Sequence, residues 1–191
     1  MPSRTVLAVI DESTPTDSGG HVHYILTASL IVAEPSAMRE HLTTLLDRQR
    51  PFHWSTDRGP VVRQKMIQFL LDHDVRSHVG VHFPTHVREQ ERARGRLLTE
   101  VVLPAILDAG ATEFWIESRA HDQDSADKLV VRNWLRERRV RLSYAWYPKA
   151  EPLLWIADAV AGAVADQRLE RGTRWFDQLH DADLLTVRQL R

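Results

Sequence analysis

Three acidic residues occur where the surrounding sequence is strongly apolar. Asp158 is the one charged residue within the stretch 152–165, which otherwise consists of apolar and small residues. Asp11 directly follows an apolar run, and Glu117 follows the segment Phe-Trp-Ile. A buried carboxylate is costly unless it is paired, hydrogen-bonded or bound to a metal ion. These three positions therefore need a chemical explanation.

Together the three carboxylates predict a site for Mg²⁺ or Mn²⁺. Carboxylates that lie close together repel one another and raise one another's pKa. A hard divalent cation relieves this repulsion and prefers oxygen ligands. Two such ions ~4 Å apart can activate water and stabilise the leaving oxygen of a phosphodiester. The expected chemistry is metal-dependent phosphodiester cleavage, with Asp11, Glu117 and Asp158 as ligands.

Each carboxylate also has a structural explanation. Asp11 can simply begin the polar turn that follows it, and Glu117 can be a surface charge at the end of a strand. Asp158 can be paired with an arginine or hydrogen-bonded to a neighbouring backbone. The metal hypothesis therefore depends on all three side chains lying together in the fold.

Two further residues belong to the candidate site. Glu12 is an additional candidate metal ligand. His53 is a candidate proton shuttle or partner of a ligand, because histidine titrates near neutral pH. The sequence contains no glycine-rich phosphate loop, Gly-x-Ser-x-Gly elbow or zinc-protease histidine pair. Ser13 and Ser118 have no evident base, so covalent catalysis is not predicted.

Histidines and arginines allow other binding chemistry. A zinc site is conceivable on two predicted strands, but the histidine spacing matches no known ligand pattern, which favours exposed or hydrogen-bonded side chains. The histidines are His21, His23, His78, His82 and His86. Two arginine runs can follow a phosphate backbone, or they can be solvated faces paired with interleaved glutamates. The runs are Arg88, Arg92 and Arg96, and Arg132, Arg136, Arg138, Arg139 and Arg141.

The elements that must position these residues follow from hydrophobic periodicity. Apolar runs and alternation predict strands. The predicted strands are 5–10, 21–32, 75–83, 113–119 and 140–147. Apolar stripes at helical spacing predict helices. The predicted helices are 35–48, 61–72, 85–109 with a kink or break at Pro104, 122–138, 152–172 and 175–180.

The order of these elements predicts an α/β fold with a mixed central sheet of about five strands. The first two strands read as an antiparallel hairpin, and the later alternation favours right-handed crossovers and parallel strands. Sites in such sheets lie beyond the carboxyl ends of the parallel strands. We expect one domain over 1–191, with a helical insertion at about 35–73 and a short helical extension at about 173–191.

Composition narrows the class of protein. Of 191 residues, 43% are hydrophobic and 27% charged, which is typical of a globular domain with a core. The net charge of −1 gives no global attraction to nucleic acid or membrane, so any such attraction must be local. Without cysteine there is no disulfide framework or thiolate metal site. No signal peptide and no apolar run of ~18 residues is present, which predicts a cytoplasmic protein without membrane association.

The sequence also resembles the domain of unknown function 3800 family over roughly residues 6–170. The resemblance is carried by Asp11-Glu12-Ser13 after a hydrophobic strand, by a second strand, and by the late helix Ile156-Ala157-Asp158-Ala159-Val160-Ala161. It implies a ribonuclease H-like three-layer fold, with Asp11, Glu117 and Asp158 at the metal-binding positions. Phe52-His53-Trp54 is similar to the family's histidine-containing connector.

Two features depart from the family pattern. The opening motif continues as Ser-Thr, and its glycines are displaced to positions 19 and 20. Ribonuclease H-like nucleases commonly add a helical carboxylate, for which Glu89, Glu91 and Glu100 are all candidates.

Two functional hypotheses result. The first is a metal-dependent nuclease that acts on DNA or RNA with Mg²⁺ or Mn²⁺. The second is a catalytically inactive interaction module of the same fold, in which the six tryptophans, Trp175 among them, supply interface anchors. A homodimer is compatible with both hypotheses.

Overall fold

The centre of the fold is strand β1 (Leu7–Ser13). It pairs antiparallel with β2 (Val22–Ile31) and parallel with β4 (Glu113–Glu117). The structure is a computed structural model that describes residues 6–46, 50–57 and 59–191. The apolar residues of β1 and all of β2 are buried, as expected for central strands covered on both faces.

Three more strands complete a six-stranded mixed sheet. They are β3 (Ser77–Thr85), β5 (Ser143–Tyr147) and β6 (Leu185–Leu190), and the order across the sheet is β5-β4-β1-β2-β3-β6. Of the six strands, β2 alone runs antiparallel to both of its neighbours. The carboxyl ends of the parallel strands β1, β4 and β5 consequently lie side by side at the same end of the sheet.

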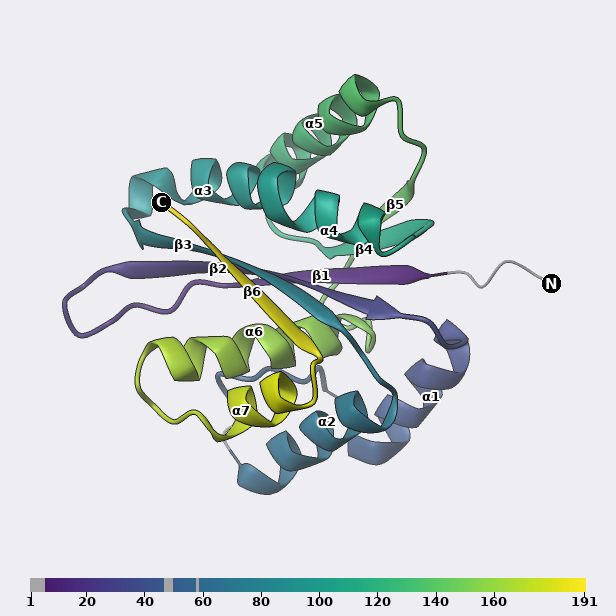
Figure 1. Cartoon of the computed structure of the whole chain (residues 1–191), viewed down its shortest axis with the longest axis vertical. Helices are drawn as coiled ribbons and strands as arrows, with labels where there is room; N and C mark the ends of the chain where they lie inside the picture. The colour runs from purple at the N-terminus through teal and green to yellow at the C-terminus, as the bar shows by residue number, and fades with distance from the viewer. Residues whose placement is uncertain (1–5, 47–49, 58) are drawn as a thin grey trace.

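Helices cover both faces of the sheet and give three layers (Figure 1). One face is covered by α3 (Gln90–Leu97), α4 (Leu103–Asp108) and α5 (His121–Arg138). The other is covered by α1 (Pro35–Leu46), α2 (Pro60–Asp72), α6 (Leu154–Arg168) and α7 (Arg174–Asp181). The predicted α/β architecture with a mixed central sheet is confirmed.

Strand alternation divides the core into two hydrophobic clusters. Leu7 and Val9 of β1 pack in the cluster that contains α6, whereas Ala8 and Ile10 pack in the cluster of α3, α4 and α5. Side chains two residues apart share a face of a strand. Alternation therefore directs Asp11 toward α6 and the next residue toward the opposite layer.

Helix α6 is the most deeply buried helix of the α1, α2 and α7 layer. Every residue from Leu154 to Ala165 is buried, and Asp158 is 5% exposed. Alanine and glycine at many of these positions let the helix lie close to the sheet. The predicted buried helix with one internal carboxylate is thus present.

The segment predicted as one helix over 85–109 is divided in the structure. Strand β3 continues to Thr85, a short 3-10 turn spans Val87–Glu89, and a π-helical turn spans Leu98–Val102 before α4. Pro104 has no backbone N–H to donate, so the regular helical bonding is interrupted as predicted.

The carbonyls released by this irregular turn find side-chain donors. The Glu100 carbonyl accepts from Arg188 Nη1 at 3.1 Å. The Thr99 carbonyl accepts from Trp134 Nε1 at 3.0 Å. The π-helical turn is thereby satisfied by bonds to β6 and α5.

The C-terminal segment differs from its predicted helical form. Helix α7 is followed by β6, which pairs parallel with β3 and makes the sheet six-stranded instead of about five-stranded. Leu185 and Val187 pack against the α6 cluster, while the other face of this edge strand is largely exposed. A short, half-exposed strand gives only a weak alternating pattern.

None of the helices that the structure describes is both long enough and apolar enough to cross a bilayer.

Candidate active site

The carboxyl ends of three strands and one face of α6 surround an open cavity of about 760 Å³. Asp11 comes from β1, Glu117 from the end of β4, and Asp158 from α6. Lys149 lies two residues beyond β5, and His53 comes from the segment before α2. The structure therefore brings the three predicted carboxylates, here called the carboxylate cluster, into one cavity with His53.

Asp11 is the most constrained member of the carboxylate cluster. Its side chain is buried, and Oδ1 accepts a hydrogen bond from Glu12 N at 2.7 Å. Among the described residues, its buried Oδ2 has no hydrogen-bond partner. Burial raises the pKa of Asp11 well above its ordinary value, and the charges of Glu117 and Asp158 raise it further. This oxygen is suited to accept a cation.

Lys149 is the positive group that the structure places in the cluster. Its Nζ lies 3.3 and 3.4 Å from the two carboxylate oxygens of Glu117. Its backbone carbonyl accepts from Trp155 Nε1 at 3.0 Å, which ties the residue to α6. Burial lowers the pKa of Lys149, but the charges of Asp11, Asp158 and Glu117 outweigh this and raise it. The ammonium therefore stays charged at neutral pH.

Asp158 anchors the segment that carries His53. Its Oδ2 accepts from Trp54 N at 2.7 Å, and its Oδ1 lies 3.3 Å from His53 Nδ1. The Asp158 side chain is 7% exposed, whereas that of His53 is 43% exposed. His53 thus joins a buried carboxylate to the open cavity, as a proton shuttle requires.

Trp54 fixes this segment against α6. Its Nε1 donates to Asp166 Oδ2 at 2.9 Å, and the Arg63 guanidinium lies over its ring at 4.2 Å. Arg63 also donates to Asp166 Oδ2 at 2.9 Å and to the Trp54 carbonyl at 2.8 Å. A Cβ at Gly162 would lie 2.1 Å from Trp54 Cγ. The indole can occupy this place only because residue 162 is glycine.

Glu12 does not join the carboxylate cluster, although it borders the cavity. Alternation along β1 turns its side chain to the opposite face of the sheet. There it pairs with Arg94 and accepts from the Tyr24 hydroxyl, and it lies 3.8 Å from Arg119 Nη1. Arg94 is buried and also bonds Asp127 at 2.8 Å. The predicted ligand role of Glu12 therefore has no geometric support.

The candidates for a fourth, helical carboxylate also lie outside the cavity. Glu91 pairs with Arg119 at 2.8 Å, and Glu100 pairs with Arg96 at 2.9 Å. Glu89 lies in the 3-10 turn before α3 and does not line the cavity. The additional acid that does line it, Asp166, is bonded to Trp54 and Arg63.

Sequence reasoning missed Lys149, Trp54 and Asp166. The rule that sites lie beyond the carboxyl ends of parallel strands would have selected Lys149, which follows β5. The spacing of Asp158, Gly162 and Asp166 by four residues places them on one face of α6. That spacing could have indicated the face of α6 on which Trp54 packs.

In the part of the chain that the structure describes, no group of three or more His, Asp or Glu side chains is arranged to bind a metal ion. The donor chemistry nevertheless fits a hard divalent cation. Asp11 and Asp158 contribute oxygens to one cavity, and the buried Asp11 Oδ2 has no hydrogen-bond donor among the residues that the structure describes.

The zinc site that the histidines made conceivable does not form among the described residues. His23 stacks on Phe83 with ring centroids 4.0 Å apart, and His82 bonds the Thr85 hydroxyl at 2.9 Å. The favoured interpretation, exposed or hydrogen-bonded side chains, fits His21, His82 and His86, whereas His23 is buried.

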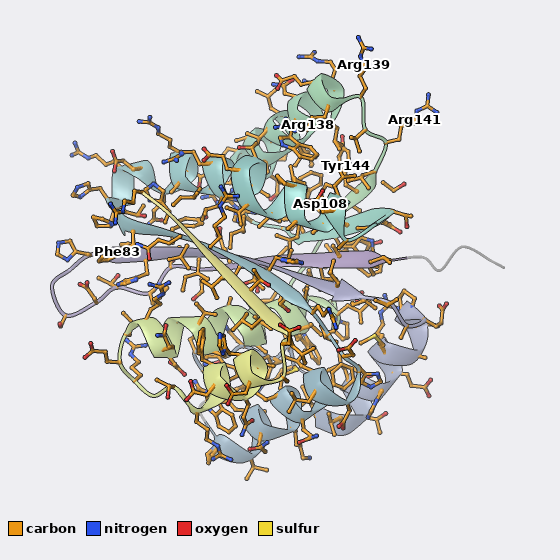
Figure 2. All side chains as sticks on the ribbon, in the orientation of Figure 1. Phe83, Asp108, Arg138, Arg139, Arg141 and Tyr144 are labelled. Carbon is orange, nitrogen blue, oxygen red and sulfur yellow. The ribbon has the colours of Figure 1, made fainter. Side chains whose placement is uncertain are left out.

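The second arginine run lies away from the cavity. The turn between α5 and β5 is at the amino edge of the parallel strands, whereas the cavity is at their carboxyl edge. Figure 2 shows Arg138, Arg139 and Arg141 around this turn at the upper right, with Phe83 on the left side of the view. In the first run, Arg96 is paired with Glu100 and also donates to the Arg191 carbonyl.

Comparison with known proteins gives structural matches only. No family model and no curated protein matches the sequence. A chain in the structure of the PCNA:RNase HII complex from Archaeoglobus fulgidus matches with a TM-score of 0.56 and 15% identity, over 90% of this chain and 78% of that chain. The ribonuclease H2 from Pyrococcus horikoshii OT3 matches with a TM-score of 0.52 and 14% identity, over 92% and 77%. The chain has a ribonuclease H-like fold. At these identities the likeness establishes the fold alone.

Replacing Asp11 by Asn is expected to stabilise the metal-free protein at neutral pH. Because burial and two carboxylates raise the pKa of Asp11 in the folded state, its ionised form favours unfolding above the unfolded pKa of about 4. The gain should be absent below about pH 4 and should grow as the pH rises, reaching about 2–4 °C in melting temperature at pH 7. Thermal melts of both proteins in EDTA at the two pH values measure it, and a less stable variant at pH 7 would refute this account of Asp11.

Proposed function

We propose that this protein is a metal-dependent nuclease that hydrolyses phosphodiester bonds in the cavity of the carboxylate cluster. The observation that carries the proposal is that Asp11, Glu117 and Asp158, from two strands and one helix, line one cavity, in which a buried oxygen of Asp11 has no hydrogen-bond donor among the described residues. The ribonuclease H-like fold supports the same class of activity.

Each residue has a distinct part in this chemistry. Asp11 and Asp158 hold Mg²⁺ or Mn²⁺, which when bound supplies positive charge for a phosphodiester and acidifies water. His53 carries a proton between the cavity and solvent, because its exposed ring contacts Asp158. Lys149 places an ammonium where a phosphate oxygen can approach.

The substrate is a nucleic acid, DNA or RNA. The cavity is also lined by Arg63 and Arg171, whose guanidinium groups can contact phosphate oxygens, although the acidic side chains that line it outnumber the basic ones. The two similar structures are a ribonuclease H2 and a complex of RNase HII with PCNA. Membership in the domain of unknown function 3800 family stays a prediction.

A cleavage assay tests the proposal directly. Labelled single-stranded DNA, duplex DNA, RNA and an RNA–DNA hybrid are incubated with the full chain in Mn²⁺, in Mg²⁺ and in EDTA. Products that require the cation are expected from at least one substrate. If no substrate is cleaved and neither cation raises the melting temperature, the proposal is wrong.

An interaction module without activity is the second candidate function. The pairing of Lys149 with Glu117 favours it, because the ammonium already compensates part of the negative charge. Its predicted tryptophan anchors are not available, since none of the six indoles is fully exposed and Trp175 packs edge-on against Trp54. The described residues likewise give no support to the predicted homodimer: the exposed large apolar side chains Val61, Val87 and Leu129 lie on three separate elements.

A further inference from the structure

The acidic side chains that line the cavity differ in how they are neutralised. Glu12 is paired with Arg94 on the far face of the sheet, and Asp166 accepts from both Trp54 Nε1 and Arg63 Nη1. Moving either acid away would take a counter-charge from a largely buried arginine, which is costly, although Arg94 would keep its bonds to Asp127. Neither is therefore free to bind a cation.

Glu117 is neutralised in a different way, by an ammonium inside the cavity. Lys149 Nζ lies within 3.4 Å of both carboxylate oxygens of Glu117. The side chain reaches this point from the end of β5, and the bond from Trp155 Nε1 to the Lys149 carbonyl holds its backbone. The pairing is thus built by two elements of the fold.

Two acidic side chains of the cavity have no hydrogen bond or ion pair to a Lys or Arg among the described residues, although the charge of Lys149 acts on both. Within the described part of the chain, Asp11 accepts a hydrogen bond from Glu12 N alone, and Asp158 contacts Trp54 N and His53. Two carboxylates suffice for a single divalent cation, with water in the remaining positions. They do not supply a second set of ligands.

We propose that the Lys149 ammonium takes the place of a second metal ion, so that the site binds one divalent cation through Asp11 and Asp158. This inference rests on the proposed function, in which the carboxylate cluster binds metal. A second ion on Glu117 would have to displace Lys149 or lie beside a like charge. Lys149 itself carries the positive charge that a second ion would bring to a phosphodiester.

The test is calorimetric titration of the full chain with MnCl₂, which measures stoichiometry and affinity without any activity. The wild-type chain is expected to bind one Mn²⁺. The variant Lys149→Met is expected to bind two, because Glu117 is released and a charge is removed, and its first site should bind about tenfold more tightly. Lys149→Arg keeps the charge and should bind one.

The controls separate this inference from the proposed function. Lys128→Met removes a lysine that lies over Trp146 and does not line the cavity, and it should bind Mn²⁺ as the wild type does. Melting curves in EDTA show whether each variant is folded. Two ions on the wild-type chain, or one ion with unchanged affinity on Lys149→Met, would overturn the role of Lys149 and leave a metal-binding site. An absence of Mn²⁺ binding in every variant would overturn the proposed function itself.

Discussion

Replacing Asp158 by Asn is expected to abolish the rise in melting temperature that Mn²⁺ gives and to reduce cation-dependent cleavage by more than about 100-fold. The amide oxygen can still accept from Trp54 N, so the segment that carries His53 stays docked. The negative charge is lost, however, and with it one of the two cavity acids that have no hydrogen bond or ion pair to a lysine or arginine among the described residues. The variant thus separates the charge of residue 158 from its place in the fold.

Melting curves with and without MnCl₂ at about 1 to 10 mM measure the first effect, and the cleavage assay measures the second. Asp72→Asn is the matched control, because it removes an exposed acid of α2 that bonds only the Gln68 side chain among the described partners. It should keep the full Mn²⁺ shift and full cleavage. If Asp158→Asn also retains both, Asp158 is a structural acid and the candidate site is wrong.

Much of the frame of the site could be predicted from the sequence. The apolar run before Asp11 and the small, apolar helix around Asp158 carry strong burial signals, and both elements are where the patterns predict them. The alternation of strands and helices indicates parallel strands, which places Glu117 at the same edge as Asp11. Here the local patterns agree with the tertiary arrangement.

The parts that could not be predicted depend on long-range contacts. Lys149 lies between Pro148 and Ala150, where no sequence pattern marks it, and its role depends on Glu117, 32 residues earlier. Glu12 adjoins Asp11, yet strand alternation sends it to Arg94 in the opposite layer. Strand β6 becomes a strand because the edge of β3 is available to pair with it.

Replacing Gly162 by Ala is expected to destabilise the protein by about 3 kcal/mol and to weaken metal binding at the same time. The new Cβ would lie 2.1 Å from Trp54 Cγ and 2.6 Å from Trp54 Cβ, so the whole side chain has to move. Its indole is held by Asp166 and Arg63, and its backbone N–H is bonded to Asp158. A shift of Trp54 therefore reaches the carboxylate cluster and carries His53 with it.

Gly95→Ala is the matched control for this substitution. Gly95 lies in α3, and a Cβ there has its nearest neighbour, Val130 Cγ2, at 4.0 Å. Alanine should stabilise that helix by about 0.5–1 kcal/mol, because it replaces a flexible residue in a helix interior. Urea unfolding and Mn²⁺ titration of both variants make the comparison. Equal stability of the two would show that Trp54 is not held against α6, and a destabilised Gly162→Ala with unchanged Mn²⁺ affinity would show that the docking of Trp54 does not set the position of Asp158.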